Sequence, residues 1–176
     1  MTVAQRKKEE HIVDHLLYCC QIEDVIRAAQ FQPMLLQQWA EQQAAAEGTD
    51  PAEEERWLLG VAHSLRDSGS MEHGHCSEVQ ETLMELAHLH ELLLGPLADA
   101  EYKASFEAAE PFLTELSEKS EKKVHAVEHL IVGLYGWLVL RLQKKAVSAE
   151  TEAAMVGLRN WANQLARGHL RVYFGK

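Results

Sequence analysis

Histidine, cysteine and glutamate side chains, which bind metal ions and carry protons, stand close together at several places in this sequence. The most specific pattern is HAVEH at residues 125–129. On a helix this spacing places His125 and His129 one turn apart with Glu128 beside them, as in one class of zinc peptidase. Such an enzyme needs a third ligand from well downstream and a much larger fold around its cleft, so zinc hydrolysis is a minor hypothesis.

A second set of candidate ligands flanks a turn-forming glycine. His73, His75 and Cys76 lie around Gly74, and their donor atoms suit zinc or nickel. A structural zinc site normally needs four convergent ligands, and only three are local. The competing interpretation is a loop in which Gly74 turns the chain before the next helix. We therefore expect no cofactor and keep a transition metal at either histidine cluster as the alternative.

Polar residues also interrupt the apolar stripes of three predicted helices. Glu23 lies in line with core positions on the first helix, and Arg27 follows at the i+4 spacing that favours an ion pair. His90 replaces an apolar residue on another helix, and Glu128 does so on a third, two turns before Tyr135. If these stripes meet, the five residues form a polar site inside the protein.

Three interpretations of this interior site remain open. Burying an ionised group costs on the order of several kcal/mol unless the group is paired. We favour a network of paired groups that fixes the helix register, because buried polar groups are usually hydrogen-bonded. A ligand pocket between helices is the second interpretation, and a metal centre of carboxylates and histidines is the third.

The elements that must position these residues are all predicted to be helical. Helical periodicity is nearly continuous, and no alternation of β-branched residues is long enough for a strand. Proline, glycine and capping residues divide the chain into segments. The predicted helices are 3–30, 33–48, 51–68, 77–94, 102–116 with a kink or split at Pro111, 124–145 with Ser120 as its cap, and one that Ser148 caps, with a frayed tail over 168–176.

The segment 124–145 is the most apolar part of the chain and is expected at its centre. Residues 130–140 carry no charge, and apolar side chains fall on every face of the helix, which is typical of a helix enclosed by others. The segment is too short to span a bilayer. The sequence therefore predicts an all-α, single-domain bundle over residues 1–176, with six to seven helices around a buried central helix.

Charge and cysteine content narrow the classes of partner and the compartment. Seventeen Lys and Arg oppose 27 Asp and Glu, and the formal net charge of −10 disfavours nucleic acid and anionic membranes as partners. Three cysteines, two of them adjacent at Cys19 and Cys20, make no disulfide framework. No secretory signal is visible, so we expect a cytoplasmic protein.

Several short segments match a known family pattern. They are residues 4–7, 16–18, 74–75, 89–90, 134–136, 140–145 and 150–155, together with Gln21, Glu23, Asp24, Arg27 and Ala28. On these residues the chain resembles an uncharacterised family of small, all-helical bacterial proteins, known mainly from Bacteroidetes and classified only as a domain of unknown function. The resemblance implies a helical fold and assigns no activity. The histidine pairs 11/15 and 125/129 do not belong to the pattern, which weakens the zinc hypothesis.

These observations favour a non-catalytic binding or protein-interaction module. We expect self-association or a protein partner through an apolar face left after the core is filled, with room for a small ligand between helices. The alternative is a metal- or carboxylate-dependent enzyme whose site lies among Glu23, His90, Glu128 and Tyr135.

Overall fold

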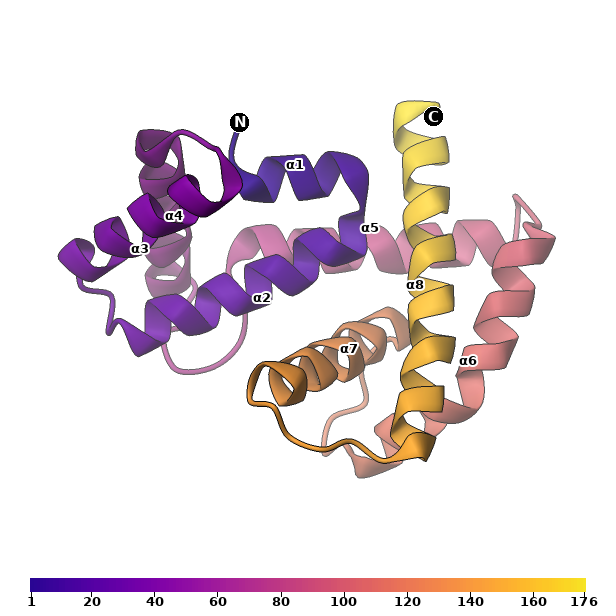
Figure 1. The fold of residues 1–176 in the computed structure, drawn as a ribbon. Helices are drawn as coiled ribbons and strands as arrows, with labels where there is room; N and C mark the ends of the chain where they lie inside the picture. Colours follow the sequence, from indigo (N-terminus) through magenta and orange to yellow (C-terminus); the bar gives the residue numbers. More distant parts are fainter. The chain divides into compact units, whose positions relative to one another are not determined.

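The computed structural model describes all of residues 1–176 and contains helices but no strands (Figure 1). The all-α prediction is confirmed, with eight helices in place of six to seven. None of them is both long enough and apolar enough to cross a lipid bilayer. In chain order the helices are α1 (Val3–Glu10), α2 (Ile12–Ala28), α3 (Pro33–Glu47), α4 (Pro51–Asp67), α5 (Ser77–Leu94), α6 (Ala100–Lys119), α7 (Ala126–Leu142) and α8 (Ala149–Phe174).

The additional helix arises because the first predicted helix, 3–30, is divided at His11. This residue has extended backbone dihedrals (φ −159°, ψ 102°), and its Nδ1 accepts a hydrogen bond from the Asp14 N–H at 3.2 Å. Its own N–H donates to the carbonyl of Lys7. His11 therefore ends α1 and caps α2, a role that asparagine, aspartate and serine fill more often and that the apolar pattern does not reveal.

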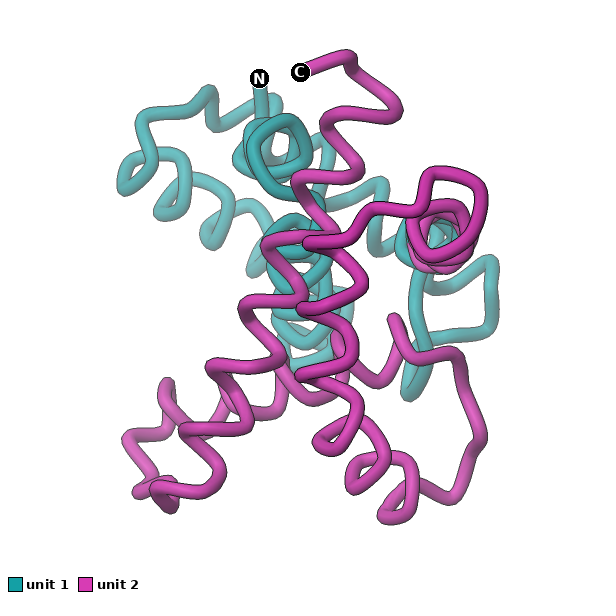
Figure 2. The backbone as a smooth tube through the Cα atoms, turned by 90° about the vertical axis from the view of Figure 1, so that its right-hand side faces the viewer, with its two compact units in different colours: residues 1–82 teal, residues 83–176 magenta.

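The chain divides into two compact units, Met1–Thr82 and Leu83–Lys176 (Figure 2). The boundary falls within α5, so this helix contributes its first residues to unit 1 and the remainder to unit 2. The expectation of one domain over residues 1–176 stays a prediction, and we describe each unit by itself.

Unit 1 is organised around α2, the helix with the most continuous burial in this half of the chain. Helix α2 packs against α1 and α4, and α3 packs against α4. Its core consists of fully buried aliphatic side chains, among them Ile12, Leu16, Ile22, Ile26, Leu36, Leu58 and Leu65. Asp50 caps α4 by accepting hydrogen bonds from the N–H groups of Ala52 and Glu53, and Pro51 is the first residue of the helix, as predicted.

Unit 2 is organised around α8, which packs against α6 and α7. Trp161, Leu158 and Leu165 of α8 are fully buried, as is Tyr102 of α6. Gly168 lets α8 approach α5, because a Cβ at this position would lie only 2.6 Å from Leu93 Cδ1. Pro111 lies inside α6, which is continuous over Ala100–Lys119, so the predicted kink or split does not take the form of a split.

The helix predicted over 124–145 is present as α7, but the predicted burial does not extend along its whole length. Helix α7 is capped by His125 rather than Ser120, and only its first half is enclosed. Val132 and Leu142 are 57% and 62% exposed. Apolar residues on every face of a segment indicate that it can be surrounded, but α6 and α8 supply neighbours mainly to the face that carries Val127, Leu130, Ile131 and Leu134.

Candidate functional site

The buried carboxylate of Glu23 holds the loop between α4 and α5, residues 68–76, against α2. Glu23 is 1% exposed. Its Oε2 lies 2.7 Å from His75 Nδ1, and its Oε1 accepts a hydrogen bond from the Cys76 N–H at 2.8 Å. Both carboxylate oxygens therefore have partners from the loop, which explains how an acid is tolerated in line with core positions.

Arg27 binds the same loop one turn later, and the predicted ion pair between Glu23 and Arg27 is wrong. The guanidinium donates to the carbonyls of Ser70 at 3.1 Å and Gly74 at 2.6 Å, and it also contacts Asp24 at 3.3 Å. The loop has carbonyl oxygens that need hydrogen-bond donors and an N–H group that needs an acceptor. Arg27 and Glu23 therefore bond to the loop and not to each other.

Three buried thiols lie beside this carboxylate in unit 1. Burial raises the pKa of Cys20 and of Cys76 to about 12 in each case, and it raises the pKa of Cys19 as well. None of the three forms a disulfide. The thiols are thus protonated at neutral pH and are weak nucleophiles in this state, which does not favour a cysteine-based enzyme.

The ligand set predicted at His73, His75 and Cys76 is replaced by a different one. The His73 side chain is 90% exposed and lies beside Glu72. His75 instead joins Cys20 and Glu23, and one potential ligand atom from each of the three lies within 4.8 Å of the others. Sequence spacing did not reveal this group, because His75 is far from Cys20 and Glu23 along the chain and meets them only through the loop.

A second group of polar side chains in unit 1 surrounds His15. His15 is 1% exposed, its Nδ1 lies 2.9 Å from the Ala4 carbonyl oxygen, and its Nε2 lies 3.6 Å from both Cys19 Sγ and a Glu78 carboxylate oxygen. The His15 imidazole lowers the pKa of the Glu78 carboxyl. A cavity of about 240 Å³, lined by residues of α4 together with Cys76 and Glu78, adjoins this region.

His90 is the buried polar residue of unit 2. Its Nδ1 lies 2.6 Å from the Tyr102 hydroxyl, and its ring makes edge contacts with those of Tyr102, Phe106, His125 and Trp161. Burial, with a smaller contribution from His125, lowers the pKa of His90 to about 4. His90 can replace an apolar residue in the stripe of α5 because its neutral imidazole is hydrogen-bonded to a phenol inside the core.

The HAVEH pattern does not form a ligand set. His125 is the N-cap residue of α7, and its Nδ1 accepts from the Val127 N–H at 3.1 Å, so this ring nitrogen caps the helix. His129 is buried and Glu128 is half-buried. His125 instead groups with His90 and Glu91 within 4.8 Å, although Glu91 and His125 are both exposed. Tyr135 is half-buried on α7, and the idea that five residues share one site stays a prediction.

A pocket of unit 2 lies between α6 and α8, and its position was not anticipated. This α6–α8 pocket has a volume of about 500 Å³. Its lining residues are Phe112, Glu115, Leu116, Lys119, Glu150, Thr151, Ala153, Ala154, Met155 and Leu158. No lining residue was a candidate in the sequence, and the only signal was that residues 150–155 belong to the segments that carry the family resemblance.

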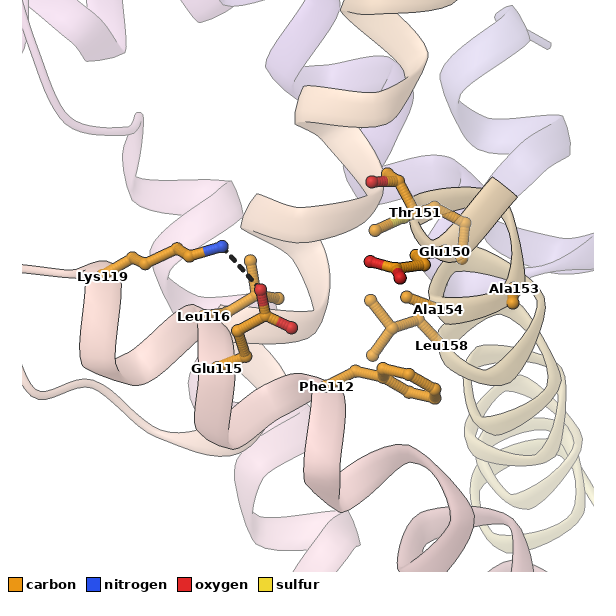
Figure 3. Close-up of a pocket in the computed structure, with 10 residues that line it drawn as sticks. Phe112, Glu115, Leu116, Lys119, Glu150, Thr151, Ala153, Ala154 and Leu158 are labelled. Atoms are coloured by element: carbon orange, nitrogen blue, oxygen red, sulfur yellow. Dashed lines mark hydrogen bonds and ion pairs between the residues drawn. The ribbon is translucent and has the colours of Figure 1, made fainter. Parts of the chain in front are cut away.

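The α6–α8 pocket has an apolar floor and charged walls (Figure 3). Phe112 and Leu158 lie at its base, with Glu115 and Lys119 on one side and Glu150 and Thr151 on the other. Lys119 Nζ pairs with Glu115 at 2.6 Å, so these two charges compensate each other. The Glu150 carboxylate has no ion-pair partner, which leaves the pocket with a net negative charge.

Comparisons with known proteins give one match. Curated proteins and solved structures yielded none. A family described as "Domain of unknown function (DUF4924)" matches residues 1–173, nearly the whole chain. The chain therefore belongs to the family described as a domain of unknown function, DUF4924.

Proposed function

We propose that this protein is a non-catalytic binding module whose unit 2 holds a small molecule in the α6–α8 pocket, and that this molecule has an apolar body and a cationic group. The observation that carries the proposal is the pocket itself, with its apolar floor and its uncompensated carboxylate. Ligand pockets commonly measure roughly 300–1,000 Å³ and combine apolar walls with few polar groups. The α6–α8 pocket, at about 500 Å³, lies within that range.

The lining side chains indicate the chemistry of the occupant. Phe112, Leu116 and Leu158 offer an apolar surface that favours a hydrocarbon chain or ring. Glu150 lies at the wall without an ion-pair partner, whereas Glu115 is already paired with Lys119. A cation placed near Glu150 gains attraction, and an anion there meets repulsion.

Octyl compounds that differ only in the head group test this proposal. Binding of octylammonium, octanol and octanoate is measured by calorimetry and by the NMR signal of the Met155 methyl group, which lines the pocket. We expect octylammonium to bind most tightly. Glu150→Gln should reduce its advantage over octanol about two- to fivefold, the value of an exposed ion pair of roughly 0.5–1 kcal/mol.

A matched pair of variants locates the binding. Ala154→Phe fills the pocket and should abolish binding, whereas Val156→Phe adds the same ring to an exposed position of α8 outside it. Equal binding by these two variants, or tighter binding of octanoate than of octylammonium, would reject the proposal.

Self-association is the second candidate function. Val132 and Leu142 expose apolar side chains on α7, which is the kind of surface that a second copy of the chain covers. Sedimentation velocity across a concentration series distinguishes a dimer from a monomer.

A further inference from the structure

Two separate segments of unit 1 bring three different metal-ligand atoms into one small volume. They are the Cys20 thiol, the Glu23 carboxylate and a ring nitrogen of His75, all within 4.8 Å of one another. Tetrahedral zinc, with bonds of about 2.0–2.3 Å, holds its ligand atoms roughly 3.5 Å apart. Small side-chain rotations would therefore close the site, and we propose that Cys20, Glu23 and His75 bind a zinc ion in unit 1.

The donor types select the metal. A thiolate, an imidazole and a carboxylate together suit a borderline ion such as zinc. Magnesium and calcium prefer oxygen ligands, and only Glu23 among the three residues supplies one, so these ions are poor candidates. Three protein ligands leave a fourth tetrahedral position open to water or a further ligand, as in zinc sites that are not closed by the protein.

The scaffold places the three ligands without help from the ion. Cys20 and Glu23 are three residues apart on α2 and so share one face of the helix. His75 comes from the 68–76 loop, which Arg27 holds through the Gly74 carbonyl and which Glu23 holds through the Cys76 N–H. A site whose ligands are fixed in advance binds metal with less ordering cost.

The surroundings allow an ion to enter and do not repel it strongly. Cys20 and Glu23 are buried, but the His75 side chain is 33% exposed and gives the site a side open to solvent. The nearest guanidinium, that of Arg27, is paired with Asp24 at 3.3 Å, which offsets its positive charge. The hydrogen bond between Glu23 and His75 would be exchanged for two bonds to the ion.

A structural role alone accounts for Glu23 and His75, which hold the loop, and for Cys20, which is buried in the core of unit 1. The Glu23–His75 contact holds the loop whether or not metal is present. Zinc binding adds the requirement that Cys20 supply a thiolate, so the ion must displace the thiol proton, which is released to solvent. The two explanations therefore differ most at Cys20, and the experiment should compare Cys20 with its neighbour Cys19, which contacts His15 instead.

Zinc titration of the full chain, in competition with a chromogenic chelator, tests the proposal. The variants Cys20→Ser and His75→Gln should each weaken zinc binding at least tenfold, since loss of even an outer-shell partner costs roughly 10- to 100-fold. The matched controls are Cys19→Ser, one residue away in sequence, and His73→Gln, in the same loop but exposed. Circular dichroism confirms that each variant is folded.

Cobalt substitution reports the ligands directly. Cobalt bound at this site should show tetrahedral visible bands and a thiolate charge-transfer band in the near ultraviolet, and the latter should vanish in Cys20→Ser. Failure of the wild-type chain to compete with the chelator for zinc overturns the proposal. Equal loss of binding in His73→Gln and His75→Gln also overturns it, because this would place zinc on surface histidines.

Discussion

Replacing Glu23 with alanine should destabilise unit 1 by removing the acceptor that the 68–76 loop depends on. The substitution leaves the buried Cys76 N–H without its acceptor at 2.8 Å and takes away the partner of His75 Nδ1 at 2.7 Å. An apolar methyl group cannot replace either interaction, and the Cys76 N–H loses its acceptor in a buried position.

The structure sets the size of the effect. A hydrogen bond to a charged group contributes about 1.5–3 kcal/mol, and an unsatisfied buried donor costs about 1–3 kcal/mol. Because the two bonds share one carboxylate and are not additive, we expect Glu23→Ala to lower the free energy of unfolding by about 3–5 kcal/mol. Glu23→Gln keeps an acceptor for the Cys76 N–H and should cost less, about 1–2 kcal/mol.

Urea denaturation followed by tryptophan fluorescence measures these losses, with Asp24→Ala as the matched control. Asp24 is the adjacent carboxylate, 55% exposed and paired with Arg27, so its loss should cost about 0–1 kcal/mol. Hydrogen exchange adds a local measurement, since the Cys76 amide should lose its protection in Glu23→Ala. If Glu23→Ala unfolds at the same urea concentration as wild type, Glu23 does not hold the loop and the argument fails.

Two further predictions concern unit 2. Gly168→Ala places a Cβ 2.6 Å from Leu93 and should lower the free energy of unfolding by about 1–3 kcal/mol. A Cβ at Gly136 has no neighbour within 4 Å, so Gly136→Ala should instead stabilise α7 by about 0.5–1 kcal/mol. Urea denaturation midpoints of the two variants test this difference. Burial lowers the pKa of His90 from 6.5 to about 4, so the unfolded chain binds the proton more readily. The neutral His90 therefore gives full stability above about pH 6.5 and up to about 3 kcal/mol less as the pH falls toward 4. His90→Gln should flatten this dependence between pH 7 and 5, and an unchanged pH profile would contradict it.

Helix boundaries marked by specific capping residues were predictable from the sequence. The predicted starts at Pro51 and after Ser148 agree with α4 and α8, and the predicted end at Gly48 agrees with α3. Each of these signals acts within a few residues, since a side chain accepts from a nearby N–H group or a glycine adopts positive φ. The boundary at His11 was missed because histidine is an uncommon cap.

Burial and pairing could not be predicted in the same way. The apolar composition of α7 does not specify how many neighbours it has, and its second half stays partly exposed. Glu23 and His90 were correctly suspected of lying inside, and both are buried. Their partners, His75 and Tyr102, come from segments whose positions depend on loops. Periodicity identifies the face on which a side chain lies but not what that face meets.

The two binding proposals act on different units, and this makes them separable in one type of measurement. A ligand that binds only the folded state adds about 2.7 kcal/mol of stability at a concentration 100 times its Kd. Zinc would stabilise unit 1 by linking the 68–76 loop to α2 through Glu23. An amphiphilic cation in the α6–α8 pocket would stabilise unit 2. Trp39 and Trp57 lie in unit 1, and Trp137 and Trp161 lie in unit 2. Variants that keep one pair of tryptophans therefore report which unit gains stability from which ligand.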